Sequence, residues 1–448
     1  MFDLEANINA WCDYLRASGK LAETDIVELE NHLRDQIEEL VTDGLSQEEA
    51  FLIGVKRLGN VNLISAEYSK VNTEQFWKQL LTDSVVSNAA KNKGRNVMLV
   101  VIFSLLAGTI AKLPNWFGVD MFTPAYFKNL SLFVLPWIIL FFVLTRNRMT
   151  KQQLWLICGI FVLTALIVNI FPSYEPHHTE ILTVIHLPIM LWLITGVAYA
   201  GKDWLLSKER MNFIRFTGEY VIYGSLIMFG LIVLFVFAST IFQSIAINID
   251  PFMFNYGFVY GGCAAAMITV YLVENKKSIV ENFAPVLAKI FSPVLILVLI
   301  TFLVVSFVTR NSPYMDRNLL IGFDLMLVLV LGIVLYTISA RNLYDPPNIF
   351  DYLNAALIVA AILVDGVALS AILQRLTEFG ISPNKLAAFG ENILLLINLA
   401  ALLWLYIRYF TGKITFSAIE KWQTSYLTVY AIWMAVVVFI FPVAFRFI

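Results

Sequence analysis

The chain has 448 residues, of which 59% are hydrophobic and only 14% are charged, a composition outside the range of soluble globular proteins. Its formal net charge is −2, and its three cysteines, Cys12, Cys158 and Cys263, form neither a disulfide framework nor a metal-ligand spacing. We therefore expect an integral membrane protein whose partner is the lipid bilayer and which binds no nucleic acid.

The distribution of charge divides the chain into three parts. Residues 1–80 hold 15 acidic and 7 basic side chains, a net charge of −8, which leaves a net charge of +6 for the rest. A short basic linker follows, and the first apolar run begins near Val97. We predict an acidic, soluble helical domain at 1–80, a linker at 81–95 and a transmembrane helical domain at 96–448.

The N-terminal domain is expected to contain four short helices. In the second helix apolar residues recur every three or four positions, which is typical of one amphipathic helix. Gly44 tolerates the left-handed conformation that ends a helix, and Ser46 with Glu49 forms a capping box that starts the next one. The four helices are predicted near 4–17, 26–41, 46–59 and 61–71.

Two parts of the chain resemble known families. The segments ELENHLRDQIEELV, DGLSQEEAF and VKRLGNVNLISAEY resemble the permease prefix domain and its relative, the HAAS signalling domain, over roughly 4–71. This resemblance implies regulation or assembly through a cytoplasmic protein partner that binds residues 1–80, and it implies no catalytic residue. The alternative is a solubilising cap that packs under the membrane domain.

From about Trp192 onward, LYDPPNIFDYLNAALIVAAIL and LQRLTEFGISPNKLAAFGENILLLINLAALLW are similar to a bacterial membrane family of unknown function. That similarity implies no activity.

Apolar runs long enough to cross a bilayer, about 20 residues each, recur along the chain. We count eleven, with ten or twelve as alternatives. Their limits are 96–113, 129–145, 153–171, 181–200, 219–245, 254–273, 286–308, 319–340, 352–373, 386–410 and 424–445. The sequence thus predicts an all-α, polytopic transmembrane bundle of about eleven spans behind a small soluble four-helix domain.

The bias of lysine and arginine between loops predicts the orientation. With the N-terminus in the cytoplasm, the inner loops and adjoining span ends hold 16 basic residues and the outer side holds 7. We therefore expect a multi-pass protein of the bacterial inner membrane, with a cytoplasmic N-terminus and a periplasmic C-terminus.

Motifs of catalysis are missing from the sequence. It has no glycine-rich phosphate loop, no His-Glu-x-x-His helix, no Gly-x-Ser-x-Gly elbow and no Cys-x-x-Cys pair. We therefore expect neither an enzyme nor a cofactor.

Three carboxylates interrupt apolar spans, where charged side chains are costly and usually face a partner, a cavity or a pathway. Asp324, Asp365 and Glu391 fall at similar depth in the outer half of spans eight, nine and ten, and Asn398 lies two turns from Glu391 on the same face. These four residues are the candidate ion or proton site. The alternative is a set of structural hydrogen bonds or ion pairs at helix ends.

The outer loop PSYEPHHTE offers a second, less favoured site. Its side chains His177, His178 and Glu180, with His186 in the following span, are a set that could bind zinc or copper. The favoured interpretation is a polar loop, because adjacent histidines rarely ligate one ion together.

The sixth span carries the small residues of GFVYGGCAAAM, which allow close helix packing. We expect this face to pack inside the bundle, with a homodimer contact as the alternative.

Two functions remain open. The favoured one is a membrane sensor or regulator whose cytoplasmic domain docks a partner, and the alternative is an ion- or proton-coupled transporter that uses the acidic residues in the outer half of spans eight to ten.

Overall fold

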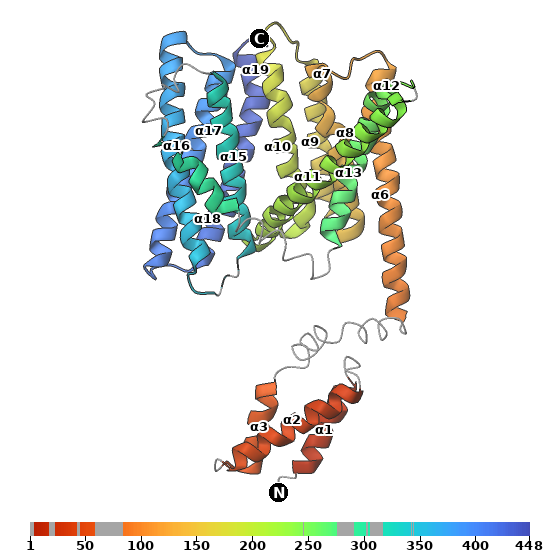
Figure 1. Cartoon of the computed structure of the whole chain (residues 1–448), viewed down its shortest axis with the longest axis vertical. Coiled ribbons are helices and arrows are strands. Elements are labelled where there is room, and N and C mark those ends of the chain that lie inside the picture. The colour runs from red at the N-terminus through yellow and green to blue at the C-terminus, as the bar shows by residue number, and fades with distance from the viewer. Residues whose placement is uncertain are drawn as a thin grey trace. The chain divides into compact units, whose positions relative to one another are not determined.

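A computed structural model describes residues 4–17, 23–42, 45–58, 84–244, 246–275, 291–301, 303–304, 317–341, 343 and 345–448. All regular elements in these residues are helices, without a strand among them, so the predicted all-α fold is confirmed. The chain divides into two compact units, Met1–Gly94 and Arg95–Ile448, whose helices are labelled in Figure 1. The boundary coincides with the end of the predicted linker.

Three of the four helices predicted for the N-terminal unit are described. They are α1 (Leu4–Ala17), α2 (Glu23–Thr42) and α3 (Gln47–Leu58). The predicted capping box is present, because Glu49 accepts a hydrogen bond from the backbone N–H of Ser46 at 3.1 Å and donates its own N–H to the Ser46 hydroxyl at 3.4 Å. The fourth predicted helix, at 61–71, lies outside the described residues.

The core of this unit is the apolar stripe of α2 together with residues of α1 and α3. Its buried members are Ile8, Cys12, Ile26, Leu29, Leu33, Ile37, Leu40 and Ala50. A Cβ atom at Gly54 of α3 would lie 2.9 Å from the Leu33 side chain, so glycine is what allows α2 and α3 to approach this closely. Burial of one stripe per helix explains why this short, charged segment folds.

The described part of the membrane unit consists largely of apolar helices. Its elements are α6 (Ser84–Trp116), which begins before the boundary, α7 (Pro124–Phe127), α8 (Leu130–Arg146), α9 (Lys151–Ile170), α10 (His178–Ala200), η1 (Gly201–Asp203), α11 (Ser207–Ser244), α12 (Asp250–Phe252), η2 (Met253–Gly257), α13 (Phe258–Glu274), α15 (Arg317–Ala340), α16 (Ile349–Phe379), α17 (Pro383–Phe410), α18 (Phe416–Ala435), η3 (Val436–Ile440) and α19 (Phe441–Ala444).

Nine helices in the described part of the chain are long and apolar enough to cross a membrane. They coincide with nine of the eleven predicted spans. The span predicted at 286–308 overlaps the shorter apolar helix Phe291–Thr301 and otherwise lies partly outside the described residues. The span predicted at 319–340 overlaps α15, whose apolar part is Asp324–Ala340. The protein is therefore a polytopic membrane protein.

The membrane unit has two opposite ends. Helix α6 enters the unit, which starts at Arg95, at one end, and the C-terminus lies at the other, beside the start of α10 (Figure 1). A backbone hydrogen bond of 2.8 Å from Thr179 to the Ile448 oxygen joins the last residue to α10. We call these the Arg95 end and the Ile448 end.

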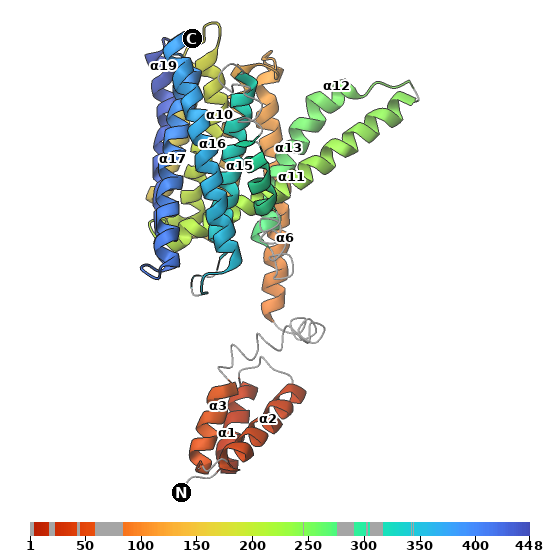
Figure 2. The same cartoon turned by 60° about the vertical axis from the view of Figure 1, so that its left-hand side comes forward.

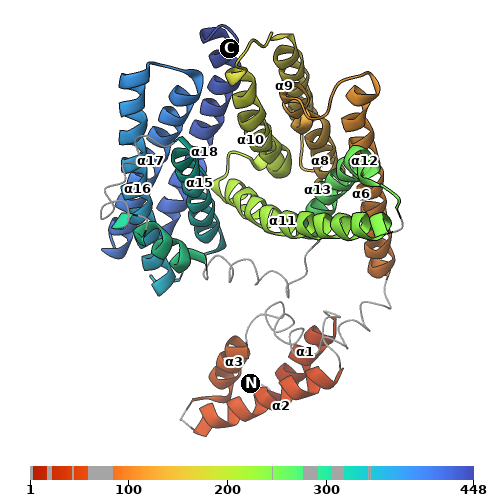
Figure 3. The same cartoon turned by 45° about the horizontal axis from the view of Figure 1, so that its top comes forward.

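Two hydrophobic clusters form the core of the membrane unit. The first gathers residues of α6, α8, α9, α10, α11 and α13 around Phe141 and Phe142. The second gathers residues of α11, α15, α16, α17 and α18 around Leu399 and Tyr406. Helix α11 contributes to both, and Figure 3 shows it crossing from one group of helices to the other.

The second half of α11 forms a hairpin with α12, η2 and α13 that projects from the bundle (Figure 2). Its apolar side chains are largely exposed, as at Phe229 with 65%, which suits contact with lipid. The small-residue face at the end of η2 and the start of α13 packs on α11. A Cβ atom at Gly257 would lie 3.0 Å from Phe235 of α11, and one at Gly261 would lie 2.9 Å from Leu231 of α11. These contacts support the expected packing inside the chain.

Candidate functional site

The start of helix α16 is fixed by a buried polar cluster. The Asn348 side chain accepts a hydrogen bond from the N–H of Phe350, and Asp351 accepts one from the N–H of Asn348, each at 2.9 Å. Asp351 also binds the Arg341 guanidinium at 2.7 and 2.9 Å. This capping box sets the rotation of α16 and therefore which of its residues face the core.

Asp365 lies on the buried face of α16, among alanines and branched apolar residues. Its exposed fraction is 0%, and neither carboxyl oxygen has a hydrogen-bond partner among the described residues. The 31-residue helix extends to Phe379, beyond the predicted limit at 373. Asp365 therefore lies near the middle of its helix, deeper than the predicted position in the outer half.

Asp324 on α15 lies close to the other two acids of the predicted set. Its carboxylate accepts a hydrogen bond of 3.0 Å from the side chain of Asn392 on α17. It also interacts electrostatically with Asp365 and with Glu391. The structure thus brings the three predicted carboxylates, from three helices, into one neighbourhood.

Glu391 on α17 is in direct contact with His186 on α10, through Oε1 and Nε2. The other ring nitrogen of His186 lies 2.7 Å from the carbonyl oxygen of Leu182. A carbonyl oxygen only accepts, so Nδ1 carries a hydrogen. Since a neutral imidazole then presents a bare Nε2 and a carboxylate has no hydrogen, their contact requires one additional proton, shared by the pair.

Asn398 on α17 is fully buried and anchors the part of the site nearest the middle of the bundle. Its amide nitrogen donates to the hydroxyl of Tyr430 at 2.9 Å, and its amide oxygen accepts from the indole of Trp422 at 2.9 Å. Its amide nitrogen also lies 3.4 Å from the side-chain oxygen of Gln423. Tyr430 interacts electrostatically with Asp365, which links this group to the acids.

We call these residues together the polar network. Its members are His186, Asp324, Asp365, Glu391, Asn392, Asn398, Trp422, Gln423 and Tyr430. Beside it, Trp433 packs against Gly390, where a Cβ atom would lie 2.1 Å from the indole ring. Buried atoms without a partner among the described residues include the Asn392 oxygen, the Gln423 nitrogen and the Trp433 nitrogen. A buried polar atom without a partner is able to form a hydrogen bond to a bound ligand, ion or water molecule.

Four members of the network were predicted from the sequence as one site, namely Asp324, Asp365, Glu391 and Asn398, and the others were not. His186 was assigned to a metal set, and the residues of α18 were not considered. A signal for them exists, because Gln423 and Tyr430 stand seven positions apart on one face of an otherwise apolar helix. Asn392 directly follows Glu391, and its amide is the group that holds Asp324.

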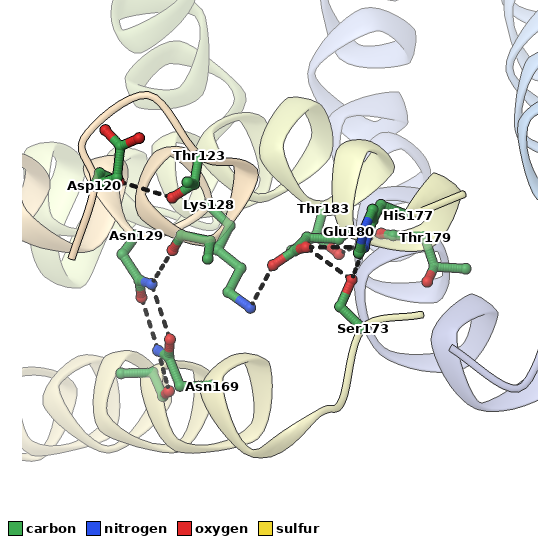
Figure 4. A network of polar contacts seen from close by, with 12 residues as sticks. Asp120, Thr123, Lys128, Asn129, Asn169, Ser173, His177, Thr179, Glu180 and Thr183 are labelled. Atoms are coloured by element: carbon green, nitrogen blue, oxygen red, sulfur yellow. Dashed lines mark hydrogen bonds and ion pairs between the residues drawn. The ribbon is translucent and has the colours of Figure 1, made fainter. Parts of the chain in front are cut away.

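The four residues of the predicted metal site are not gathered around one point. Glu180 binds Lys128 at 2.9 Å and lies 3.8 Å from His177 (Figure 4), whereas His186 binds Glu391. Among the described residues, no group of three histidine, cysteine, aspartate or glutamate side chains is placed to hold a metal ion.

Comparison of the chain with known protein families, characterised proteins and solved structures finds no match. The two family resemblances noted in the sequence therefore stay predictions.

Proposed function

We propose that the protein is a transporter that moves protons or a small cation across the membrane through the polar network. The network lies inside a bundle of membrane-spanning helices, and its members come from α10, α15, α16, α17 and α18. Charged and polar residues in such a position usually serve an ion or proton pathway.

Asp365 is the observation that carries this proposal. An ionised carboxylate without a partner is costly in a medium of low dielectric constant, so Asp365 requires a proton or a bound cation. Nearby Asp324 adds a second negative charge, which increases that requirement. A side chain that must take up a positive charge in the middle of a bundle is suited to carry one.

The pair of His186 and Glu391 supports the same role. Its contact places one proton between the imidazole and the carboxylate. Asn392 holds Asp324 beside it, because its amide donates to that carboxylate at 3.0 Å and is itself fixed by a hydrogen bond of 2.8 Å to the Ala388 carbonyl oxygen. The network therefore contains groups that hold a proton and groups that position them.

Purified full-length protein in proteoliposomes tests this function. We would trap a pH-sensitive dye inside, impose a membrane potential with potassium and valinomycin, and follow proton flux, with a parallel assay of sodium uptake. Asp365→Asn keeps the shape of the side chain but cannot ionise, so we expect it to abolish flux. Asp120→Asn is the control, because Asp120 is an exposed acid whose carboxylate accepts a hydrogen bond from the N–H of Phe122. Flux in Asp365→Asn equal to that of the wild type would rule out the proposal.

A second candidate function is regulation through a partner of the N-terminal domain. Support comes from the separate core of this unit, which packs α1, α2 and α3 on one another. Flux measured after removal of residues 1–80 distinguishes transport from regulation. If flux persists without these residues, the N-terminal domain is regulatory. If neither the full-length protein nor any variant carries flux, the result favours a sensor without transport.

The orientation in the membrane belongs to this proposal. We place the N-terminal unit in the cytoplasm and Ile448 outside, in a bacterial inner membrane, on the bias of 16 to 7 basic residues. A reporter fused after Ile448 that is active only in the cytoplasm would contradict this placement.

A further inference from the structure

A second group of polar side chains lies at the Ile448 end of the bundle, outside the polar network (Figure 4). Lys128 Nζ is 2.9 Å from one carboxylate oxygen of Glu180, and the Ser173 hydroxyl donates to the other at 2.8 Å. The side chains of Lys128 and Glu180 are each only 10% exposed, whereas that of His177 is 43% exposed. This ion pair is therefore nearly covered but is linked to a side chain that faces outward.

The hydrogen bonds of this group have a defined direction. The single hydrogen of the Ser173 hydroxyl goes to Glu180, whose carboxylate only accepts. The contact of 2.7 Å between Ser173 and His177 Nδ1 must then use a hydrogen of the imidazole. The three side chains form a relay from His177 through Ser173 to Glu180, along which a proton can move inward.

A small cavity adjoins the ion pair. It has a volume of about 20 Å³, and its lining includes Lys128, Ser173, Thr179, Glu180, Thr183 and Pro442. A water molecule needs roughly 10 to 15 Å³ and two to four polar partners. The cavity meets both conditions, so it has room for one water molecule.

The cavity reaches within one helical turn of the polar network. Thr183 lines it, and His186 lies three positions further along α10, which places the two side chains side by side on the helix surface. Both are buried. The Thr183 hydroxyl donates its hydrogen to the carbonyl oxygen of Thr179 at 2.9 Å, so its oxygen can still accept from the water.

We propose that this cavity is a water-filled port that brings protons from the Ile448 end to Thr183, one helical turn from His186 of the polar network. The inference rests on the proposed function and names its ion. A cavity with room for one water cannot admit a hydrated sodium or potassium ion. A proton needs no such space. His177 gives an N–H hydrogen to Ser173, Ser173 passes its own hydrogen to Glu180, and Glu180 passes one to the water, so each hop breaks one O–H or N–H bond and forms another.

The first test measures proton flux in the proteoliposomes described above. Thr183→Leu fills the cavity without offering a hydrogen-bonding group, and we expect flux to fall about tenfold or more. Thr183→Val removes only the hydroxyl at nearly constant volume, and the same direction of loss is expected. It keeps the test valid if the leucine variant does not fold.

Thr195→Val is the matched control. Thr195 lies on the same helix, is 0% exposed, and donates its hydroxyl to the Leu191 carbonyl at 2.9 Å, just as Thr183 bonds Thr179. We expect its flux to equal that of the wild type. Unchanged flux in both Thr183 variants, or sodium flux that Thr183→Val reduces, would overturn the port.

Failure of the port and failure of the proposed function give different results. If Asp365→Asn stops flux and the Thr183 variants do not, only the port is wrong. If the wild type carries no flux, the port is tested instead by the access of water and Ag⁺ to the cavity. In a variant whose native cysteines are alanine, Ag⁺ should protect the thiol of Thr183→Cys, and not that of Thr195→Cys, from later alkylation in detergent. Equal protection of the two thiols would refute the port.

Discussion

His186 of α10 and Glu391 of α17 are in direct contact across the bundle, although 205 positions separate them in the chain. Since Glu391 is 34% exposed at its side chain and His186 only 5%, the pair joins a buried ring to a partly accessible carboxylate. The pair connects α10, whose first turn is bonded to Ile448, with the polar network.

Removal of either partner should destabilise the protein. We expect His186→Leu to lower the free energy of unfolding by about 1 to 3 kcal/mol, because it leaves a charged group without its hydrogen-bond partner. Thermal unfolding in detergent measures this, and a double-mutant cycle with Glu391→Leu should give a coupling of about 0.5 to 3 kcal/mol. His178→Leu, at a neighbouring half-buried position, is the control and should change stability by less than about 0.5 kcal/mol. Additivity of the two network substitutions would contradict the contact.

Asp365 and Asp351, on the same helix, should respond in opposite ways to the change from aspartate to asparagine. Asp365 has no hydrogen bond to lose among the described residues, so Asp365→Asn should leave the melting temperature nearly unchanged while it abolishes flux. Asp351→Asn breaks the buried pair with Arg341 and should cost roughly 3 to 5 kcal/mol. Differential scanning of both variants tests the contrast, and a large destabilisation by Asp365→Asn would mean a structural role.

Gly390 should not tolerate a larger residue. Gly390→Ala would place a Cβ atom 2.1 Å from the indole ring of Trp433 and should cost about 1 to 3 kcal/mol, because neither the ring nor α17 can move freely in the packed core. At Gly366, beside Asp365, the described residues outside the adjoining backbone of α16 place no atom within 4 Å of the added Cβ, so Gly366→Ala is the matched control. Alanine in a helix is favoured over glycine by about 1 kcal/mol, so this variant should be neutral or more stable. Equal melting temperatures for the two variants would disprove the packing.

A fragment of residues 1–80 should fold alone and lose stability in acid. Hydrogen bonds from the Ser46 side chain and backbone hold the pKa of Glu49 below its ordinary value of 4.5, and the hydrogen bond from Arg34 lowers the pKa of Glu5. A carboxylate with a lowered pKa in the folded state contributes stability above its unfolded pKa and loses it as the pH falls through the lowered value. Urea unfolding should therefore show lower stability at pH 3 than at pH 7, with a smaller difference in Glu49→Gln. A random-coil circular dichroism spectrum at pH 7 would contradict independent folding.

Local features of the sequence were sufficient for the helices and for the class of protein. The apolar stripe of α2 and the capping box of Ser46 and Glu49 depend on residues within one or two turns, so both could be predicted. Membrane spans could be predicted because transfer into a bilayer is nearly additive over about 20 residues. Asp324, Asp365 and Glu391 were recognisable because a carboxylate stands out in an apolar run.

Only the tertiary structure decided which of these groups interact. The sequence placed His186 with the histidines of the adjacent loop, but its ring nitrogen binds Glu391. It placed Asp365 in the outer half of its span and left open a structural partner, whereas the folded chain buries both carboxyl oxygens without one among the described residues. The reason is physical: which side chains meet depends on the rotation and tilt of each helix, and these are set by packing between helices that lie far apart in the sequence.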